Sequence, residues 1–159
     1  NKNSFYVQRI ILNNPYQNRY NNNQDLFIHL RAGDIFSYNK NNMIPYLTYY
    51  TKILDKYKNL YKKIYLSSDN IDCQFCQYLV KTYKIEIYNN DKVDTIQFAS
   101  TCKYIILSSG SYSLMIGLLS FFTEKVFYDE NIGKLLKNNK MIEWHPNFLR
   151  DINSDILNI

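Results

Sequence analysis

The sequence predicts an α/β domain in which a mostly parallel sheet carries helices on both faces. Strand-like and helix-like segments alternate about five times along the 159 residues, as the βαβ pattern of a parallel sheet requires. The strand-like segments are continuous apolar runs, which is typical of strands buried on both faces. A chain of this length supports one domain. We therefore expect a single domain over residues 1–159, with a core over about 24–130 and a helical tail over 131–159.

The expected strands are short apolar runs that end in polar residues. The first is the most strongly apolar, because every residue from Leu26 to Leu30 except His29 is aliphatic or aromatic. A short apolar run between polar segments is typical of a buried strand. The expected strands lie within Gln24–Phe36, Lys63–Leu66, Ile85–Tyr88, Tyr104–Leu107 and Lys125–Tyr128.

Helices are expected between these strands because apolar residues recur there at helical spacing. One apolar stripe runs along Tyr46–Tyr57, and Pro45 precedes it at a position where a missing N–H costs nothing. Asp69 and Asn70 are expected to cap the next helix. The expected helices are Tyr46–Tyr57, Ile71–Tyr83, Asp91–Thr101 and Tyr112–Phe122, and the tail from Asn131 is expected to be helical or irregular.

The composition excludes several classes of protein. With 46% hydrophobic residues, 4 Gly, 3 Pro and 3 Cys, the chain is not collagen-like, disordered or a disulfide scaffold. Its longest apolar runs are interrupted before the roughly 20 residues that cross a bilayer, so no membrane segment is expected, and no signal peptide is visible. The chain begins at Asn1 without Met, and we expect it to be cut from a longer protein.

The net charge of +5 does not indicate a protein that binds nucleic acid. The excess is carried by lysines dispersed along the chain, with only four arginines, whereas a nucleic-acid reader concentrates its cations on one stripe. Asn and Tyr are overused throughout, so runs of these residues are poor evidence of function. Arg, Gly, Asp and His are the informative residues against this background.

The segment from His29 to Asp34 carries the strongest local signal of a site. Arg31 follows a buried strand, and a guanidinium there offers a fork of charged donors suited to a phosphate group. Gly33 lets the backbone turn tightly beside a ligand. Asp34 is placed to hold Arg31, to bind a ligand hydroxyl or to accept a proton. A structural Arg–Asp pair at the end of the strand is the alternative, and the residue types fit both interpretations.

A second signal is the serine-rich turn from Ser108 to Ser113, between an apolar strand and an apolar helix. Backbone N–H groups and hydroxyls at a helix N-terminus form a ready site for an anion. The turn lacks the Gly-Lys-Ser/Thr ending of a Walker loop, and Gly110 stands alone, so it is not a GxGxxG fingerprint either. Considered in isolation, the turn is better explained as a helix cap by Ser111 or Ser113.

Other candidate residues are better explained by packing. Cys73 and Cys76 have the spacing of a redox or zinc pair, but no second pair exists and the histidines lack ligand spacing. We interpret these cysteines as buried free thiols inside a helix. His29 is expected to be a core histidine hydrogen-bonded to a neighbour, and His145 to pack the C-terminal segment. No metal site and no cofactor are expected.

The predicted topology places the polar segments together. Connections between parallel strands are right-handed, so the carboxyl ends of all the strands lie on one edge of the sheet, where ligands of open parallel sheets bind. The segments that follow the strands are expected to meet at this edge. They are Arg31–Asp34, Ser67–Asp69, Asn89–Asp91, Ser108–Ser113 and Asp129–Glu130.

Three of these segments resemble motifs of the fucosyltransferase superfamily, in particular the nucleotide-sugar-binding half of α-1,2-fucosyltransferase-like proteins. Asp25–Phe36 resembles the family's H-x-R-x-G-D motif after a strand, and Ile64–Asp69 is similar to its second strand. Phe98–Ser113 is similar to its helix–strand–S-x-F-S motif. Their order and spacing match over roughly residues 24–129.

The resemblance implies a Rossmann-like fold, the donor-binding domain of a GT-B-like glycosyltransferase. The implied reaction transfers fucose from GDP-fucose to a glycan hydroxyl without a metal, so the implied partners are a nucleotide sugar and a glycan acceptor. Arg31 would bind the diphosphate and stabilise the charge of the leaving nucleotide, and Asp34 is the candidate catalytic base. The implied substrate-binding residues are His29, Gly33, Asp69, Ser111, Tyr112 and Ser113.

The chain also departs from this family. Many relatives have a second Arg where Ala32 stands, and the aromatic pair that often follows the serine motif is replaced by Leu114-Met115. The residues before the first strand are too few for an acceptor domain, so we expect either that this domain lies upstream or that the protein is a reduced one. A non-catalytic nucleotide- or glycan-binding module and a purely structural domain are the alternatives. The compartment stays open: cytoplasm for a viral or bacterial source, Golgi lumen for a eukaryotic one.

Overall fold

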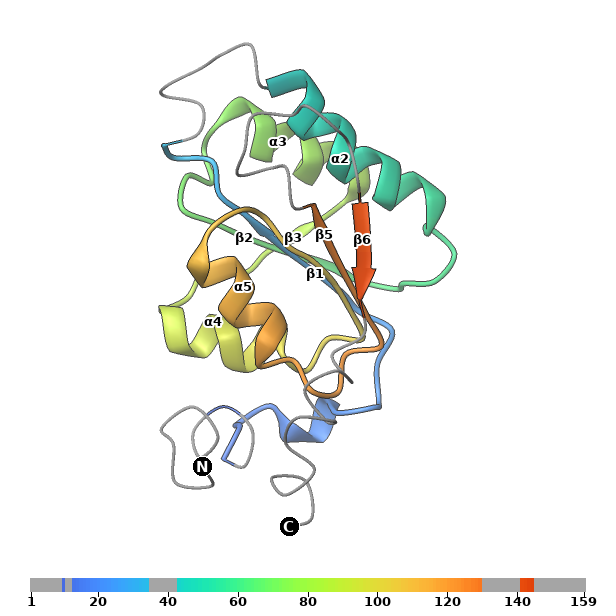
Figure 1. The fold of residues 1–159 in the computed structure, drawn as a ribbon, viewed down its shortest axis with the longest axis vertical. Coiled ribbons are helices and arrows are strands. Elements are labelled where there is room, and N and C mark those ends of the chain that lie inside the picture. The colour runs from blue at the N-terminus through green and yellow to red at the C-terminus, as the bar shows by residue number, and fades with distance from the viewer. Residues whose placement is uncertain (1–9, 11–12, 35–42, 130–140, 145–159) are drawn as a thin grey trace.

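The computed structural model describes residues 10, 13–34, 43–129 and 141–144, and it confirms the predicted α/β fold. A six-stranded sheet forms the centre of the molecule (Figure 1), in the order β3-β2-β1-β4-β5-β6. Strands β1 to β5 are parallel, and β6 runs antiparallel to β5. The strands are β1 (Leu26–Leu30), β2 (Ile64–Ser68), β3 (Glu86–Ile87), β4 (Tyr104–Ile106), β5 (Lys125–Asp129) and β6 (Met141–Trp144).

The order of the strands determines where a ligand can bind. From β1 the chain moves outward to β2 and β3, and it then returns to the other side of β1 to form β4 and β5. The strand order therefore reverses between β1 and β4. In open α/β sheets, ligands bind in the crevice beyond the carboxyl ends of the strands at such a switch point. Here the two segments that leave the switch point begin at Arg31 and Leu107.

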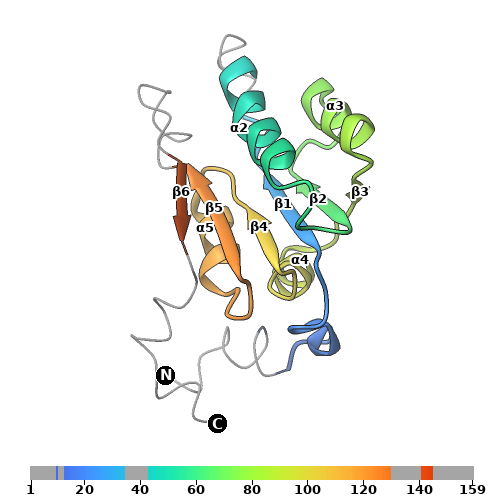
Figure 2. The same ribbon diagram turned by 90° about the vertical axis from the view of Figure 1, so that its right-hand side faces the viewer.

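Helices cover both faces of the sheet. Helices α2 and α3 pack on one face, and α4 and α5 pack on the other (Figure 2). In the described part of the chain, no helix has the length and apolar character needed to span a bilayer. The helices are the 3-10 turn η2 (Gln17–Arg19), α2 (Met43–Lys56), α3 (Gln74–Tyr83), α4 (Lys92–Ala99) and α5 (Ser111–Leu118).

The central strand β1 supplies side chains to both layers. Leu26, Ile28 and Leu30 pack with α2 and α3, whereas Phe27 packs with α4 and α5, because side chains alternate along a strand. These four side chains are at most 1% exposed. Burying an aliphatic or aromatic side chain of this size contributes about 1.5–3 kcal/mol. The same alternation directs His29 toward the α4 and α5 layer, where the candidate site lies.

Helix α3 begins later than predicted because its cap is a different residue. It starts at Gln74 instead of near Ile71, and its N-cap is Cys73. The expected cap by Asp69 or Asn70 is wrong, and so is the expectation that Cys73 lies inside the helix. The cap of Cys73 is made by its sulfur, which accepts a hydrogen bond from a backbone N–H of the first turn.

The two later helices are shorter than predicted at their ends. Asp91 precedes α4 as its N-cap, and its side chain accepts hydrogen bonds from two N–H groups of the first turn. Helix α4 ends at Ala99, where Ser100 and Thr101 continue as a turn. Helix α5 ends at Leu118. Apolar residues continue past the end of α5, which is why the sequence pattern alone extends this helix too far. The end of α4 differs from the prediction by two residues, which is within the usual uncertainty of a helix boundary.

The expected helical tail is wrong at Met141–Trp144, which form the edge strand β6. Its pairing with β5 places Trp144 opposite Val126. Without β6, the outer edge of β5 would expose a row of unpaired N–H and C=O groups, and an added strand satisfies them. The remaining tail, with His145, lies outside the described residues, and so does Glu130.

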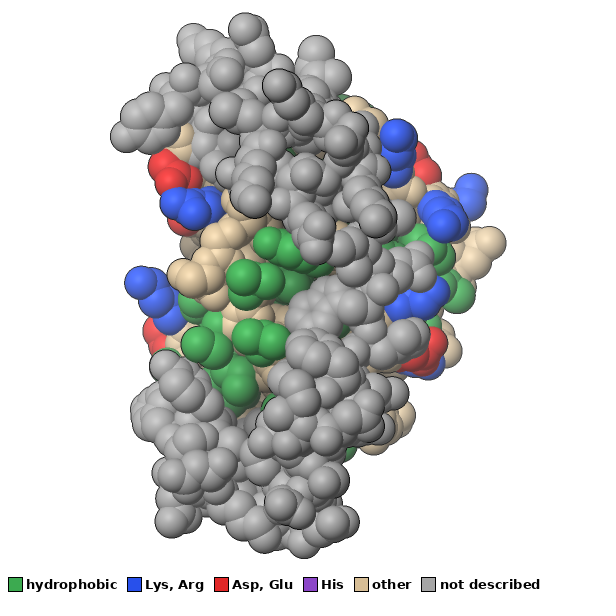
Figure 3. Space-filling view, viewed as in Figure 1, with side chains coloured by type: hydrophobic (Ala, Val, Ile, Leu, Met, Phe, Trp, Pro, Cys, Tyr) green, Lys and Arg blue, Asp and Glu red, His purple; other side chains and the backbone are tan. Residues whose placement is uncertain are grey.

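Helix α5 is apolar around most of its circumference. Ile116 and Gly117 are buried in the layer that it shares with α4, while Leu114 and Leu118 are only partly covered. Figure 3 shows hydrophobic side chains gathered on the middle of the face that this helix occupies in Figure 1. An all-round apolar helix is typical of an element that has neighbours on more than one side.

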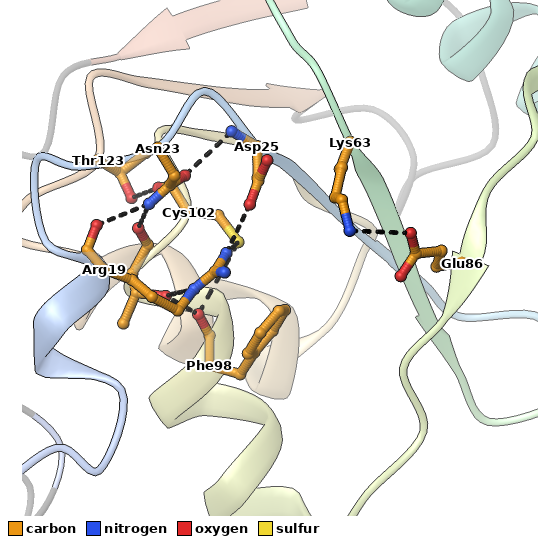
Figure 4. Close-up of polar contacts among 9 residues, drawn as sticks. Arg19, Asn23, Asp25, Lys63, Glu86, Phe98, Cys102 and Thr123 are labelled. Atoms are coloured by element: carbon orange, nitrogen blue, oxygen red, sulfur yellow. Dashed lines mark hydrogen bonds and ion pairs between the residues drawn. The ribbon is translucent and has the colours of Figure 1, made fainter.

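The segment before β1 is tied to the amino-terminal edge of the sheet by Arg19 (Figure 4). Its guanidinium donates to Asp25 at 2.7 Å and to the hydroxyl of Thr101 at 3.0 Å. It also lies 4.6 Å from the ring centroid of Phe98, which adds a cation–π contact. Asn23 bonds the carbonyls of Arg19 and Thr101 at 2.7 and 2.9 Å. This segment is therefore part of the domain and packs at the amino-terminal end of the sheet.

Candidate functional site

Arg31 follows β1 directly, and Asp34 holds its guanidinium. Nε donates to Oδ1 of Asp34 at 2.9 Å, and Nη2 makes a second contact with Oδ2. Both side chains are partly exposed, at 42% and 45%. The hydrogen bonds from Arg31 to this carboxylate raise the pKa of Arg31 above its ordinary value, so the guanidinium is charged at any working pH. The Arg–Asp pair that the sequence allowed is present.

Gly110 is where the serine-rich turn meets Arg31. Its φ of 99° lies in the region that favours glycine, and a Cβ at this position would lie 2.8 Å from Nη1 of Arg31. Gly110 is also the N-cap of α5, so the expected cap by Ser111 or Ser113 is wrong. Among the described residues, no side chain caps α5 by accepting a hydrogen bond from the N–H groups of its first turn. The positive end of this helix thus lies beside a guanidinium.

Asp69 orders the loop that carries Arg31. Its Oδ1 accepts hydrogen bonds from the N–H groups of Ala32 at 2.6 Å and of Gly33 at 3.0 Å. A Cβ on Gly33 would lie 2.9 Å from Oδ2 of Asp69, so a side chain at this position would displace the Asp69 carboxylate. Asp69 comes from the end of β2, the neighbour of β1. It therefore fixes the loop after β1 across the sheet edge.

A chain of buried hydroxyls connects β1 to α5. The N–H of Arg31 donates to Oγ of Ser108 at 3.0 Å, and the Tyr46 hydroxyl contacts the same oxygen. The N–H of Ser108 in turn donates to Oγ of Ser113 at 2.7 Å, and this oxygen lies 3.0 Å from Nδ1 of His29. Ser108 and Ser113 are both fully buried. The expected hydrogen-bonded neighbour of His29 is therefore Ser113.

The His29 imidazole is held neutral. It is 7% exposed, and its ring packs edge-on against Tyr112 with centroids 5.1 Å apart. Burial lowers the pKa of His29 to about 4; the negative charge of Asp69 opposes this shift, and the positive charge of Arg31 adds to it. At neutral pH the ring therefore offers one donor and one acceptor nitrogen without a charge.

These groups surround one cavity of about 320 Å³ at the switch point. The structure brings together Arg31, from the end of β1, and the serine-rich turn at the start of α5. Predicted site residues that line the cavity are His29, Arg31, Asp69, Ser111 and Tyr112, and the other lining residues are Lys92, Ser109 and Gly110.

Lys92 is the cavity residue that the sequence analysis missed. It is the first residue of α4, and its side chain is exposed. The Tyr112 hydroxyl donates to the carbonyl of Lys92 at 2.8 Å, which ties the start of α4 to α5. Its position directly after Asn89–Asp91, one of the segments expected at this edge, was the available signal. The cavity thus has a second cation, from a different element than Arg31.

Three predicted site residues do not line the cavity. Asp34 lies outside the cavity and binds Arg31, and Gly33 lies against the Asp69 carboxylate. Ser113 is enclosed between Ser108 and His29. Each therefore acts on a lining residue and not on the cavity itself. Among the described residues, no three His, Cys, Asp or Glu side chains gather as a metal site would need.

A larger cavity, of about 560 Å³, lies at the opposite edge of the sheet. Lysines and amides line it, but most of its cations are paired within the domain. Lys63 lies 3.4 Å from Glu86, and Arg19 is held by Asp25 (Figure 4). This edge carries the amino ends of the strands, where open α/β sheets do not bind their ligands. We therefore place the candidate site at the smaller cavity.

No protein-family model and no curated protein sequence matches the chain. Among solved structures, NodZ α-1,6-fucosyltransferase soaked with GDP-fucose is similar, with a TM-score of 0.54 and 12% identity over 89% of this chain and 48% of that one. POFUT1 in complex with GDP-fucose is similar over 72% of this chain and 42% of that one, with a TM-score of 0.45 and 13% identity. The chain therefore spans about half the length of NodZ. The likeness to NodZ confirms the Rossmann-like α/β fold.

Proposed function

We propose that the cavity at the switch point binds the diphosphate of a nucleotide sugar, and that the chain is the donor-binding domain of a glycosyltransferase. One observation carries the proposal: the Arg31 guanidinium and the N-terminus of α5 line the same cavity. Both bind anions, the guanidinium as a fork of charged donors and the helix N-terminus through its free N–H groups. Lys92 adds a second positive side chain to a cavity that lacks the second arginine that many fucosyltransferase-like proteins have at the position of Ala32.

In this proposal Arg31 binds the two phosphates and stabilises the negative charge that develops as the nucleotide leaves the sugar. Electrostatic stabilisation of a leaving group by fixed donors is worth several kcal/mol in a site of this kind. Asp69 and Asp34 serve Arg31 indirectly, since one fixes its loop and the other its guanidinium. His29 presents a neutral ring to the cavity, because its burial disfavours the charged form.

The donor that we propose is GDP-fucose, and the acceptor is a glycan hydroxyl. The motif resemblance of His29–Asp34 and of the serine-rich turn supports this choice, and the NodZ structure was soaked with GDP-fucose. The proposed transfer uses no metal, because Arg31, Lys92 and the helix N-terminus provide the positive charge that a metal would otherwise bring.

A non-catalytic nucleotide-binding module is the second candidate. The observation that favours it is the engagement of Asp34, the candidate base: both of its carboxylate oxygens contact Arg31. A carboxylate that accepts two charged hydrogen bonds is a weak base, because the bonds stabilise its ionised form. Such a module would bind a nucleoside diphosphate and leave its sugar intact.

A panel of nucleotides separates these functions. The full chain is heated with GDP, GDP-fucose, GMP, UDP or CMP, each well above its expected dissociation constant. A ligand at about 100 times its Kd adds about 2.7 kcal/mol, which raises the Tm of a domain of this size by roughly 5–10 °C. We expect GDP and GDP-fucose to give this rise and GMP, which lacks the second phosphate, to give less.

Each other result has a definite meaning. A panel in which no nucleotide raises Tm would refute the nucleotide site and leave a structural domain. Equal shifts with UDP and GDP would refute the guanine donor and keep the diphosphate site. Release of GDP from GDP-fucose in the presence of glycan acceptors, measured in the same preparation, would distinguish the transferase from the binding module.

A further inference from the structure

The start of α3 carries two thiols in a geometry that the sequence did not predict. Cys73 precedes the helix as its N-cap, with an extended backbone at φ −64° and ψ 147°. Its Sγ accepts a hydrogen bond from the N–H of Cys76 at 3.4 Å, so the Cys73 side chain folds back over the first turn. Both cysteines are free thiols.

This arrangement brings the two sulfurs together. Residues three apart on a helix turn have Cβ atoms about 5–6 Å apart, and a disulfide needs about 3.5–4.5 Å, a small adjustment at a helix end. Cys73 is the N-cap, so the adjustment takes place at the end of the helix, where the Cys73 carbonyl accepts the first α3 hydrogen bond from the N–H of Gln77 at 3.0 Å. Burial raises the pKa of the Cys76 thiol well above its ordinary value, a hydrogen bond with Ser68 opposes the rise, and the neighbouring Cys73 thiol adds to it.

The two thiols differ in access to a reagent. Cys73 is partly exposed, whereas Cys76 is fully buried, so an oxidant in solution meets Cys73 first. The thiolate is the form of a cysteine that attacks a disulfide. Cys102, the third cysteine, is fully buried in the layer on the other side of the sheet, and its sulfur contacts Arg19. The pair is thus separate from the remaining thiol.

We propose that Cys73 and Cys76 form a dithiol modification site, which closes to a reversible disulfide in the presence of a small-molecule disulfide such as oxidised glutathione. The Cys73 thiolate attacks one glutathione sulfur, the glutathione S–S bond breaks, and one glutathione thiolate leaves and takes up a proton. The Cys76 thiol then releases its proton, attacks the Cys73 sulfur and displaces the second glutathione. The protein loses two electrons and two protons, and the glutathione disulfide gains both.

The disulfide is expected to loosen the loop that carries Arg31. The Ser68 hydroxyl hydrogen-bonds the Cys76 sulfur and accepts from the N–H of Asn70 at 3.2 Å. Asp69 lies between Ser68 and Asn70 in the sequence, and its carboxylate accepts hydrogen bonds from the N–H groups of Ala32 and Gly33. Oxidation replaces the thiol by a weaker hydrogen-bond partner of Ser68. It therefore loosens the turn that positions Asp69, and amide exchange at Ala32 and Gly33 becomes faster.

The test uses the full chain, first reduced and then incubated with oxidised glutathione. The protein is denatured, alkylated and cleaved after Lys and Arg, which places both thiols of the pair on one peptide, Ile64–Lys81, and Cys102 on another. We expect the Ile64–Lys81 peptide to be unalkylated and lighter by two hydrogen atoms, with full reversal by dithiothreitol. The Cys102 peptide stays alkylated.

Two variants make the result specific. Cys73→Ser keeps a good N-cap residue and should form no intramolecular bond, whereas Cys102→Ala should behave like the unchanged chain. A stable glutathione adduct on Cys73, or an alkylated Cys76 after full oxidation, would overturn the proposal.

Amide exchange by mass spectrometry then tests the consequence. We expect several-fold faster exchange at Ala32 and Gly33 in the oxidised chain and no change in oxidant-treated Cys73→Ser. Equal exchange in both would overturn the link between the disulfide and the loop. Neither measurement needs a bound nucleotide, so a failure here is distinct from a failure of the proposed function.

Discussion

At the scale of single residues, His29 shows how burial sets the chemistry of the site. Its imidazole lies between Ser113 and Tyr112 at the inner wall of the cavity. Burial lowers the pKa of His29 to about 4, more than two units below its ordinary value, because a charged ring would lose its hydration there. The histidine therefore contributes hydrogen-bonding capacity to the cavity but no charge at neutral pH.

This shift predicts a pH dependence of stability. Between about pH 6.5 and about pH 4, His29 is protonated in the unfolded chain but neutral in the folded chain. The free energy of unfolding therefore falls as the pH falls through this window. The loss reaches at most about 3 kcal/mol. Urea unfolding at several pH values should show a shallower fall for His29→Gln than for the unchanged chain. Identical pH profiles would mean that His29 is not buried as a neutral ring.

Two features of the site were beyond the reach of sequence patterns. Asp69 was expected as a helix cap and as a substrate-binding residue, but its hydrogen bonds to the loop of Ala32 depend on the pairing of β2 with β1. The place of Lys92 after Asn89–Asp91 indicated the right edge of the sheet, but only the packing of α4 against α5 places it at the cavity. Arg31 and the serine-rich turn were predictable because each follows a buried strand. Contacts between different strands were not.

At the scale of elements, the N-terminus of α5 is the second half of the candidate site. Gly110 supplies the turn into the helix, and Ser111, its first residue, is exposed at the cavity. The macrodipole gives this end a partial positive charge that attracts an anion. The backbone N–H of Ser111, not only its hydroxyl, is therefore expected to bind phosphate.

Ser111→Pro tests the role of this N–H directly. Proline fits the first position of a helix, and the ψ of 160° at Gly110 suits a residue before proline, so α5 should form as before. The change removes the donor, and we expect GDP to bind roughly 10-fold to 100-fold more weakly, as loss of a hydrogen bond to a charged group requires. Ser111→Ala, which keeps the N–H, should lose much less. Calorimetric titration compares them, and equal affinities for both variants would count against the helix site.

Elements were predicted well where the physics is local. Apolar runs and helical spacing predicted the bounds of β1, β2, α2 and α4 to within a few residues. These patterns show directly which side chains of a segment are buried. The strand β6 was missed because it forms only by pairing with the edge of β5. The composition of the segment does not show this pairing. The cap of α3 was missed because a cysteine seldom fills that role.

At the scale of the whole molecule, the segment before β1 belongs to the domain. Asn14 is 1% exposed, and its amide bonds the carbonyls of Ile10 and Gln97 at 3.0 and 2.8 Å. It also bonds the hydroxyls of Tyr20 and Ser100. These contacts join the N-terminal segment to the end of α4. The N-terminal segment therefore packs at the amino-terminal end of the sheet, whereas the candidate site lies at the carboxyl-terminal end.

This arrangement predicts a large cost for losing Asn14. Asn14→Ala removes one hydrogen-bond partner from each of several buried polar groups, and we expect the free energy of unfolding to fall by about 1–3 kcal/mol. Asn22→Ala is the matched control, since Asn22 is exposed and its replacement should change stability by no more than about 0.5 kcal/mol. Denaturant unfolding measures both. Equal stability of the two variants would mean that the N-terminal segment is not an integral part of the domain.

A calorimetric titration of Arg31→Ala with GDP shows whether this guanidinium holds the diphosphate. Because this side chain is 42% exposed and its ion pair with Asp34 lies at the surface, we expect stability to change by no more than about 1 kcal/mol. GDP affinity should fall at least roughly 10-fold. Lys62→Ala, which removes one positive charge from the opposite edge of the sheet, should bind GDP like the unchanged chain. Equal GDP affinity in Arg31→Ala and Lys62→Ala would contradict the account.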